Sequence, residues 1–183
     1  MDDNWLTRAR QRLEREVLEI EHRTDLTDDQ KADRIVVIFS TVCAGIAVQP
    51  IPFADFFILT PLQAYLGTRL AAIRGIRLSD QESTDILKQL MGVIGLGLLA
   101  QQLGIAAAKI LFPIFGGMAT IPVVFGLTYA IGTVMDKFFV AKAAGHSLSK
   151  AEIRNIWKNA KHKGEREGKR QEESIKRDRD ETR

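Results

Sequence analysis

The residues able to carry chemistry are few in this chain, and none forms a catalytic or metal-binding pattern. The three histidines, His22, His146 and His162, lie in charged or loop-like stretches, and no Cys/His spacing resembles a metal site. The single cysteine, Cys43, lies in an apolar run, which excludes a disulfide framework and indicates a buried thiol. We therefore predict a non-enzymatic protein with no metal and no cofactor.

One glycine-rich run invites comparison with a nucleotide-binding loop. Gly92, Gly95 and Gly97 stand in the wrong order for the dinucleotide-binding fingerprint, inside a helical pattern, and they follow no predicted strand. The sequence also contains no P-loop motif. We interpret these glycines as positions of close helix packing.

Isolated polar residues near or within the apolar part are the candidates for contact with lipid or a partner. Asp55 is the only acid between residues 35 and 79; it is either an interfacial contact residue or a helix cap after a proline turn. Lys109 has a side chain long enough to reach lipid headgroups from an apolar segment. The candidate contact residues are Asp55, Gln63, Arg69, Arg74, Arg77 and Lys109.

Charge divides the chain into three parts, which the net charge of +3 and mean hydropathy of -0.07 conceal. Residues 1–34 hold seven Lys/Arg and ten Asp/Glu, residues 35–135 hold five and four, and residues 136–183 hold fourteen and nine. The basic C-terminal part suits anionic headgroups, nucleic acid or an acidic partner, or is simply a solvated helix. Nucleic acid is not expected, because this part has many acids and lacks interleaved aromatics.

Helical periodicity and helix-start signals predict an all-α fold. Capping boxes stand at Thr27–Gln30, Ser79–Glu82 and Ser149–Glu152, and Thr60 followed by proline predicts another cap. Beyond Lys161 almost no apolar residue remains, which predicts solvated helix or a disordered tail. We divide the chain into a charged N-terminal amphipathic helix (1–31), an apolar helical-hairpin domain (32–144), and a basic C-terminal helix and tail (145–183).

The apolar segments predict two helical hairpins in a membrane. Leu90–Phe112 and Met118–Met135 comprise 23 and 18 residues, against about 20 needed to cross a bilayer, and two earlier segments are shorter. The predicted turns, Pro50–Asp55 and Pro113–Gly117, contain no Lys or Arg, whereas both termini and the connection 69–88 do. This asymmetry places both termini and the connection 69–88 on the cytoplasmic side. Hairpins that dip into the membrane without crossing it, or a soluble bundle of Leu-rich helices, explain the same segments.

Small residues at intervals of four lie along these segments, where they allow helices to approach closely. The predicted helix-packing residues are Gly67, Ala71, Gly75, Ala100, Gly104, Ala108 and Gly126.

Three motifs in order carry a family resemblance. Pro50–Asp55 fits P-x-P-x-A-D, Leu59–Gln63 fits L-T-x-L-Q, and Arg69–Gly75 fits a basic helix end. These motifs are followed by a capped apolar helix, a Pro/Gly turn, a second apolar helix and a tail helix that begins with Gly-x-Ser. The chain thus resembles, over about residues 32–163, an uncharacterised GTPase-associated helical family (domain of unknown function six-nine-seven, YcjF-like), and more weakly EcsC-type proteins. It departs in Pro61, in its longer charged tail and in lacking a GTPase domain.

The resemblance implies a helical protein of the bacterial inner membrane that acts with a GTPase in trans. Together with the charge layout, it predicts an oligomeric anchor or effector for a cytoplasmic partner, in contact with membrane lipids. Pore formation or membrane remodelling by the two hairpins is one alternative. A soluble adaptor, which binds another chain through the apolar stripes of Leu6–Ile20 and Ile153–Trp157, is the other.

Overall fold

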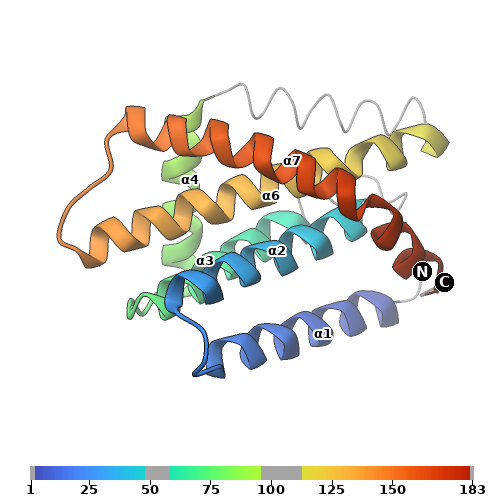
Figure 1. Cartoon of the computed structure of the whole chain (residues 1–183), viewed down its shortest axis with the longest axis horizontal. Coiled ribbons are helices and arrows are strands. Elements are labelled where there is room, and N and C mark those ends of the chain that lie inside the picture. The colour runs from blue at the N-terminus through green and yellow to red at the C-terminus, as the bar shows by residue number, and fades with distance from the viewer. Residues whose placement is uncertain (1–2, 48–57, 96–112, 182–183) are drawn as a thin grey trace.

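The computed structural model describes residues 3–47, 58–95 and 113–181, and over these residues the fold is all-helical. The helices pack into a bundle in which α6 lies at the centre and α7 runs antiparallel beside it (Figure 1). Its helices are α1 (Asp3–His22), α2 (Asp28–Ala47), α3 (Thr60–Ile73), α4 (Asp80–Ile94), α6 (Pro113–Ala143) and α7 (Lys150–Glu181).

Three of the helices begin at the predicted capping boxes. The Thr27 backbone N–H donates to Gln30 Oε1 (3.0 Å), and the Gln30 N–H donates to Thr27 Oγ1 (3.2 Å). Ser79–Glu82 and Ser149–Glu152 make the same reciprocal pair of bonds. These bonds satisfy backbone donors that a helix start leaves without an intrahelical acceptor.

The cap predicted at Thr60 is wrong. The N-cap of α3 is Leu59, whose backbone is already helical (φ −71°, ψ −37°) and whose side chain makes no capping bond. A hydroxyl caps a helix when its own backbone is extended. Because a helical turn precedes Thr60, only the predicted first-turn proline is present there.

Glycine in the left-handed region ends two helices. Gly75 (φ +73°) follows α3, where the N–H groups of Gly75 and Ile76 donate to the carbonyls of Ala72 and Ala71. Gly145 (φ +76°) ends α6 with an equivalent pair of bonds. No atom lies within 4 Å of a Cβ built on Gly75, so its predicted role in helix packing is wrong; it ends the helix instead.

Between residues 121 and 141, other helices cover most of the central helix α6. Its fully buried side chains include Ile121, Phe125 and Phe139, which belong to one core with Phe39 of α2 and Leu66 of α3. In the part of the chain that the structure describes, one segment, residues 121–143, is long and apolar enough to cross a membrane. Of its most apolar window, 72% is buried inside the bundle, as in the core helix of a soluble protein.

Two further predictions concern the ends of these helices. Pro113–Gly117 is not a turn but the first part of α6. Proline is tolerated there because the first turn has no acceptor for its missing N–H, and glycine costs only about 1 kcal/mol in a helix. For the residues beyond Lys161, predicted as solvated helix or a disordered tail, the helix is the alternative observed: α7 continues to Glu181, and its glycines and Ile175 pack it onto the core.

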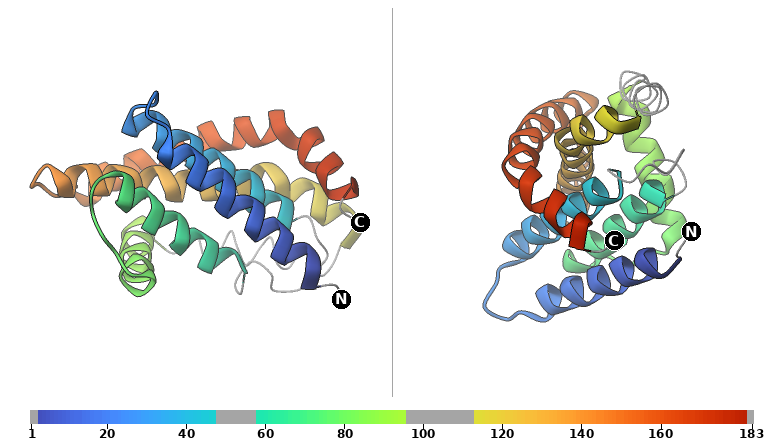
Figure 2. Two further views of the ribbon diagram at one scale, coloured as in Figure 1. Left: turned by 90° about the horizontal axis from the view of Figure 1, so that it is seen from below. Right: turned by 90° about the vertical axis from the view of Figure 1, so that its right-hand side faces the viewer.

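The ends of the bundle differ in the connections that they carry. The three described connections, 23–27, 74–79 and 144–149, lie together at one end in the views of Figures 1 and 2. The opposite end carries the start of α1, the end of α2, the start of α6 and the end of α7. The predicted cytoplasmic connection, 74–79, therefore lies at the end opposite to both termini.

Candidate functional site

Two of the predicted contact residues, at the C-terminal end of α3, have partners inside the fold. Arg69 donates to both carboxylate oxygens of Glu21 in α1, with Nε 2.6 Å from Oε1. Its guanidinium also lies 5.9 Å from the centroid of the Tyr65 ring. Burial lowers the pKa of Arg69, but the group stays charged because its ordinary value is far above neutrality. Arg69 thus joins α1 to α3.

Arg74 binds two carboxylates from different helices. Its Nε lies 2.8 Å from Asp136 Oδ1 in α6, and a terminal nitrogen lies 2.7 Å from Asp29 Oδ1 in α2. Burial raises the pKa of Asp136, against the opposing effect of Arg74, whereas the hydrogen bond from Arg74 lowers the pKa of Asp29. Arg74 therefore compensates a nearly buried carboxylate and connects α3 to α2 and α6.

Gln63 lies in a small buried polar group rather than at the surface. Its Nε2 donates to Thr128 Oγ1 over 3.3 Å, and Thr128 also makes a hydrogen bond with Cys43. Burial raises the pKa of the Cys43 thiol to about 12, so the thiol is neutral near pH 7 and a poor nucleophile. These residues join α3, α6 and α2 through polar contacts in the core.

Of the seven predicted helix-packing residues, those in the described part other than Gly75 lie at helix contacts. The interpretation of Gly92 and Gly95 as packing positions is wrong, because no atom lies within 4 Å of a Cβ built on either. A Cβ on Gly67 would lie 2.2 Å from Met135 Cε and 2.3 Å from Ser83 Oγ, and Ala71 is fully buried. A Cβ on Gly126 would lie 2.6 Å from Glu165 Cγ. The same Cβ would lie 3.0 Å from the backbone nitrogen of Glu165, so α6 and α7 approach each other backbone to backbone at Gly126.

The sequence analysis missed the matching glycines of α7. A Cβ on Gly164 would lie 2.9 Å from Gly126 Cα, and one on Gly168 would lie 3.0 Å from Pro122 Cα. The signal was present as G-x-x-x-G over residues 164–168. It was overlooked because every residue between the two glycines is charged, which resembles a solvated helix.

The remaining predicted residues fall into two groups. Arg77 is exposed in the connection between α3 and α4. The others lie outside the described residues; they are Asp55, Lys109, Ala100, Gly104 and Ala108. The prediction that the polar ones contact lipid or a partner stays a prediction.

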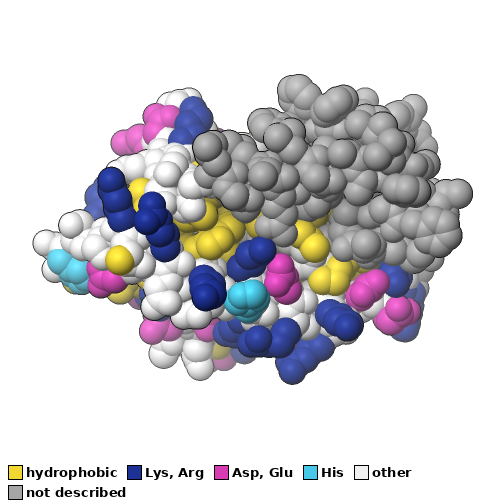
Figure 3. Space-filling model, turned by 90° about the horizontal axis from the view of Figure 1, so that it is seen from above, with side chains coloured by type: hydrophobic (Ala, Val, Ile, Leu, Met, Phe, Trp, Pro, Cys, Tyr) yellow, Lys and Arg dark blue, Asp and Glu magenta, His cyan; other side chains and the backbone are white. Residues whose placement is uncertain are grey.

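The outer face of α7 carries an excess of exposed basic side chains. Between residues 150 and 177 the exposed side chains include eight Lys/Arg but two Glu. The other three Glu of this range are partly covered and pair with basic residues of α7 itself, as in Lys161–Glu165 (3.5 Å) and Lys176–Glu172 (2.8 Å). Figure 3 shows the Lys and Arg side chains gathered in a band on this side of the molecule.

The described residues offer no arrangement typical of a metal centre. No group of three or more His, Cys, Asp or Glu side chains among them is placed to hold a metal ion. What the described part presents is therefore a packed core, internal ion pairs and one basic face.

Comparison with known proteins adds no relative. No family model, no curated protein and no solved structure matches this chain.

Proposed function

We propose that the protein is a non-catalytic, membrane-associated helical anchor or effector whose bundle lies on the membrane surface. The observation that carries the proposal is the contrast between two kinds of connection. The three connections at one end of the bundle are polar and lead into capped helices. The two stretches outside the described residues, 48–57 and 96–112, are apolar in sequence and contain one charge each.

The described ends that flank residues 96–112 favour a surface orientation. Arg154, near the start of α7, donates to the carbonyl of Val93 (3.0 Å), three residues before the stretch. At the other side of the stretch, α6 packs against α7 at Pro122 and Gly168. The residues that flank the apolar stretch 96–112 on both sides therefore lie beside the basic helix α7. Apolar residues next to Lys and Arg are typical of proteins that lie in the membrane interface.

The packing of α7 argues against a bilayer crossing by α6 in this conformation. Cations of α7 would accompany the segment around Pro122–Tyr129 into the hydrocarbon, at about 2.5–3.5 kcal/mol for each charge near its centre. The two-hairpin topology predicted from the sequence would also need both termini and the connection 74–79 on one membrane face, although α1 begins and α7 ends at the end of the bundle opposite to this connection. If the long helices lie parallel to the membrane surface, the cations of α7 stay outside the hydrocarbon, and opposite ends of the bundle can lie on the same membrane face.

The partner and the compartment come from the sequence alone. Under this proposal the protein belongs to the bacterial inner membrane, has both termini in the cytoplasm, assembles with further copies of itself, and serves a cytoplasmic partner, a GTPase by family resemblance. The adaptor alternative is weaker, because residues of the apolar stripes that would bind another chain are already packed against other helices of the bundle. Leu13 and Val17 of α1 are buried, as is Ile153 of α7, and Trp157 packs against the core.

Fractionation and carbonate extraction of cells that express the full chain test the proposal. A surface-bound protein is expected in the membrane fraction and is expected to be released, at least in part, by alkaline carbonate. A protein that stays wholly in the soluble fraction and is monodisperse without detergent would contradict membrane association. Complete resistance to carbonate would instead favour the two membrane-crossing hairpins and contradict the surface orientation.

A further inference from the structure

The outer face of α7 carries basic side chains that the fold itself does not use. Lys158, Arg166 and Lys169 are exposed, and none of them has an ion pair with any residue in the described ranges. By contrast, Arg69 and Arg74 are each held by an internal carboxylate. An arginine or lysine without an internal partner keeps its full capacity to bind an external anion.

Helical spacing places these three cations on one side of α7, within an arc of about 80° around its axis, and we call them the basic row. The first and last lie eleven residues apart, which is about 16 Å along a helix at 1.5 Å per residue. His162 is exposed within the same stretch and pairs weakly with Glu165 (Nδ1–Oε2 3.6 Å). Three cations spread over this length on the outside of one helix fit an extended anionic surface better than a single small anion.

We propose that this row binds the anionic headgroups of membrane phospholipids and makes membrane binding selective for them. The inference rests on the proposed surface orientation and names the lipid that it would require. Lipid is favoured over nucleic acid because chain on both sides of the apolar residues 96–112 lies beside α7. The row also has no exposed aromatic side chain on which a base could stack, since Trp157 packs against the core.

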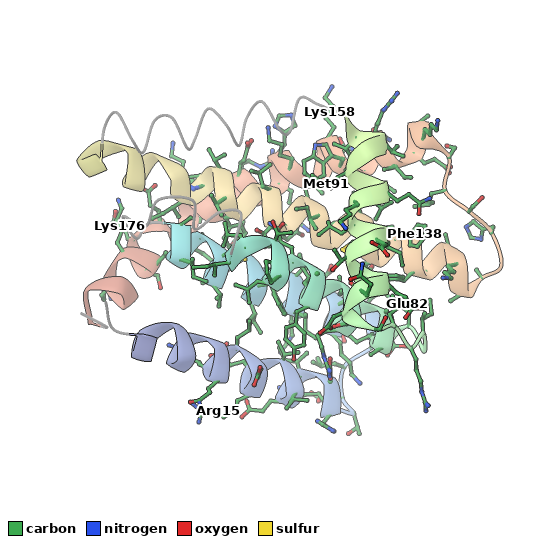
Figure 4. All side chains as sticks on the ribbon, turned by 180° about the vertical axis from the view of Figure 1, so that it is seen from behind. Arg15, Glu82, Met91, Phe138, Lys158 and Lys176 are labelled. Carbon is green, nitrogen blue, oxygen red and sulfur yellow. The ribbon has the colours of Figure 1, made fainter. Side chains whose placement is uncertain are left out.

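Exposed basic residues outside α7 supply a matched control. Lys158 projects from one edge of the bundle and Arg15 of α1 projects from the other (Figure 4). Arg15, Arg77 and Lys88 are all exposed and lie outside α7. Neutralising them removes the same charge as neutralising the row, so any difference between the two triple variants reports the position of the charges.

The experiment is vesicle flotation with the purified full chain. The vesicles are made of phosphatidylcholine alone or of phosphatidylcholine mixed with phosphatidylglycerol, and circular dichroism confirms that each variant keeps its helix content. The wild type is expected to bind the anionic vesicles more strongly. Lys158→Gln/Arg166→Gln/Lys169→Gln is expected to lose about fivefold per residue, on the order of a hundredfold in total, while Arg15→Gln/Arg77→Gln/Lys88→Gln changes much less. Raised salt should weaken wild-type binding to anionic vesicles, because the Debye length shortens to about 3 Å at 1 M.

The failures of the two proposals are distinguishable. Equal binding to neutral and anionic vesicles, unchanged by the α7 substitutions, would overturn the lipid selectivity and leave membrane association standing. Equal losses in the two triple variants would also overturn it, because only total charge would then matter. Absence of binding to either kind of vesicle would overturn both proposals. Stronger binding to a DNA duplex than to anionic vesicles, lost in the α7 variant, would assign the row to nucleic acid instead.

Discussion

Close contact between α6 and α7 makes Gly164 a demanding test of the fold. Alanine there would place a methyl group 2.7 Å from Tyr129 Cβ and 2.9 Å from Gly126 Cα. The second contact is with backbone, which cannot move away as a flexible side chain can. Overpacking of this kind costs about 1–3 kcal/mol, whereas replacing glycine by alanine in a helix gains about 1 kcal/mol. We expect Gly164→Ala to leave the free energy of unfolding unchanged or to lower it by up to about 2 kcal/mol.

Gly92 provides the matched control for the helix-propensity gain. It is exposed in α4, and no atom lies within 4 Å of its added Cβ. Gly92→Ala is therefore expected to raise the free energy of unfolding by up to about 1 kcal/mol. Because both substitutions share the propensity gain, the difference between them isolates the packing cost, which we expect to be about 1–3 kcal/mol.

Urea unfolding followed by far-UV circular dichroism measures both variants. The expected difference corresponds to a separation of roughly 2–12 °C in melting temperature for a chain of this size. If Gly164→Ala is stabilised as much as Gly92→Ala, then α7 does not lie against α6 as described. A bilayer crossing by α6 would then no longer take the cations of α7 into the hydrocarbon.

Three further predictions concern side chains in the bundle. Arg74→Gln is expected to lower the free energy of unfolding by about 2–4 kcal/mol near pH 7, whereas Arg77→Gln changes it little, because only Arg74 compensates a nearly buried carboxylate. Burial already raises the pKa of Asp136, and loss of Arg74 raises it further. Protonation of Asp136 at acidic pH should therefore reduce the difference in free energy of unfolding between Arg74→Gln and the wild type. A difference that grows on acidification would refute this. Cys43, with a pKa of about 12, should resist iodoacetamide in the folded chain and react fully in urea, as mass spectrometry can show; rapid labelling of folded protein would contradict its burial. Thr27→Ala is expected to lower the free energy of unfolding by about 1 kcal/mol through loss of its cap, which thermal unfolding can compare with Thr24→Ala; equal effects would argue against the capping box.

The sequence by itself determined the local features of this protein. The capping boxes at Thr27, Ser79 and Ser149 are formed as predicted, and so are the helix ends near Gly75 and Gly145. These signals are reliable because a cap or a left-handed glycine acts on backbone groups within about four residues of itself. The same local information predicted that Cys43 is buried, since it lies within a continuous apolar run.

The tertiary structure alone decided which element covers which. Apolar composition is the same whether lipid or another helix surrounds a segment, so the sequence could not distinguish a membrane span from the buried centre formed by α6. The basic residues of α3 were assigned to external contacts because their partners, Glu21 and Asp136, lie 48 and 62 residues away in the chain. The stretch that contains Gly164 and Gly168 resembled a solvated helix in sequence. Close packing at a glycine depends on the neighbour that occupies the space of the missing side chain, and only the folded chain shows that neighbour.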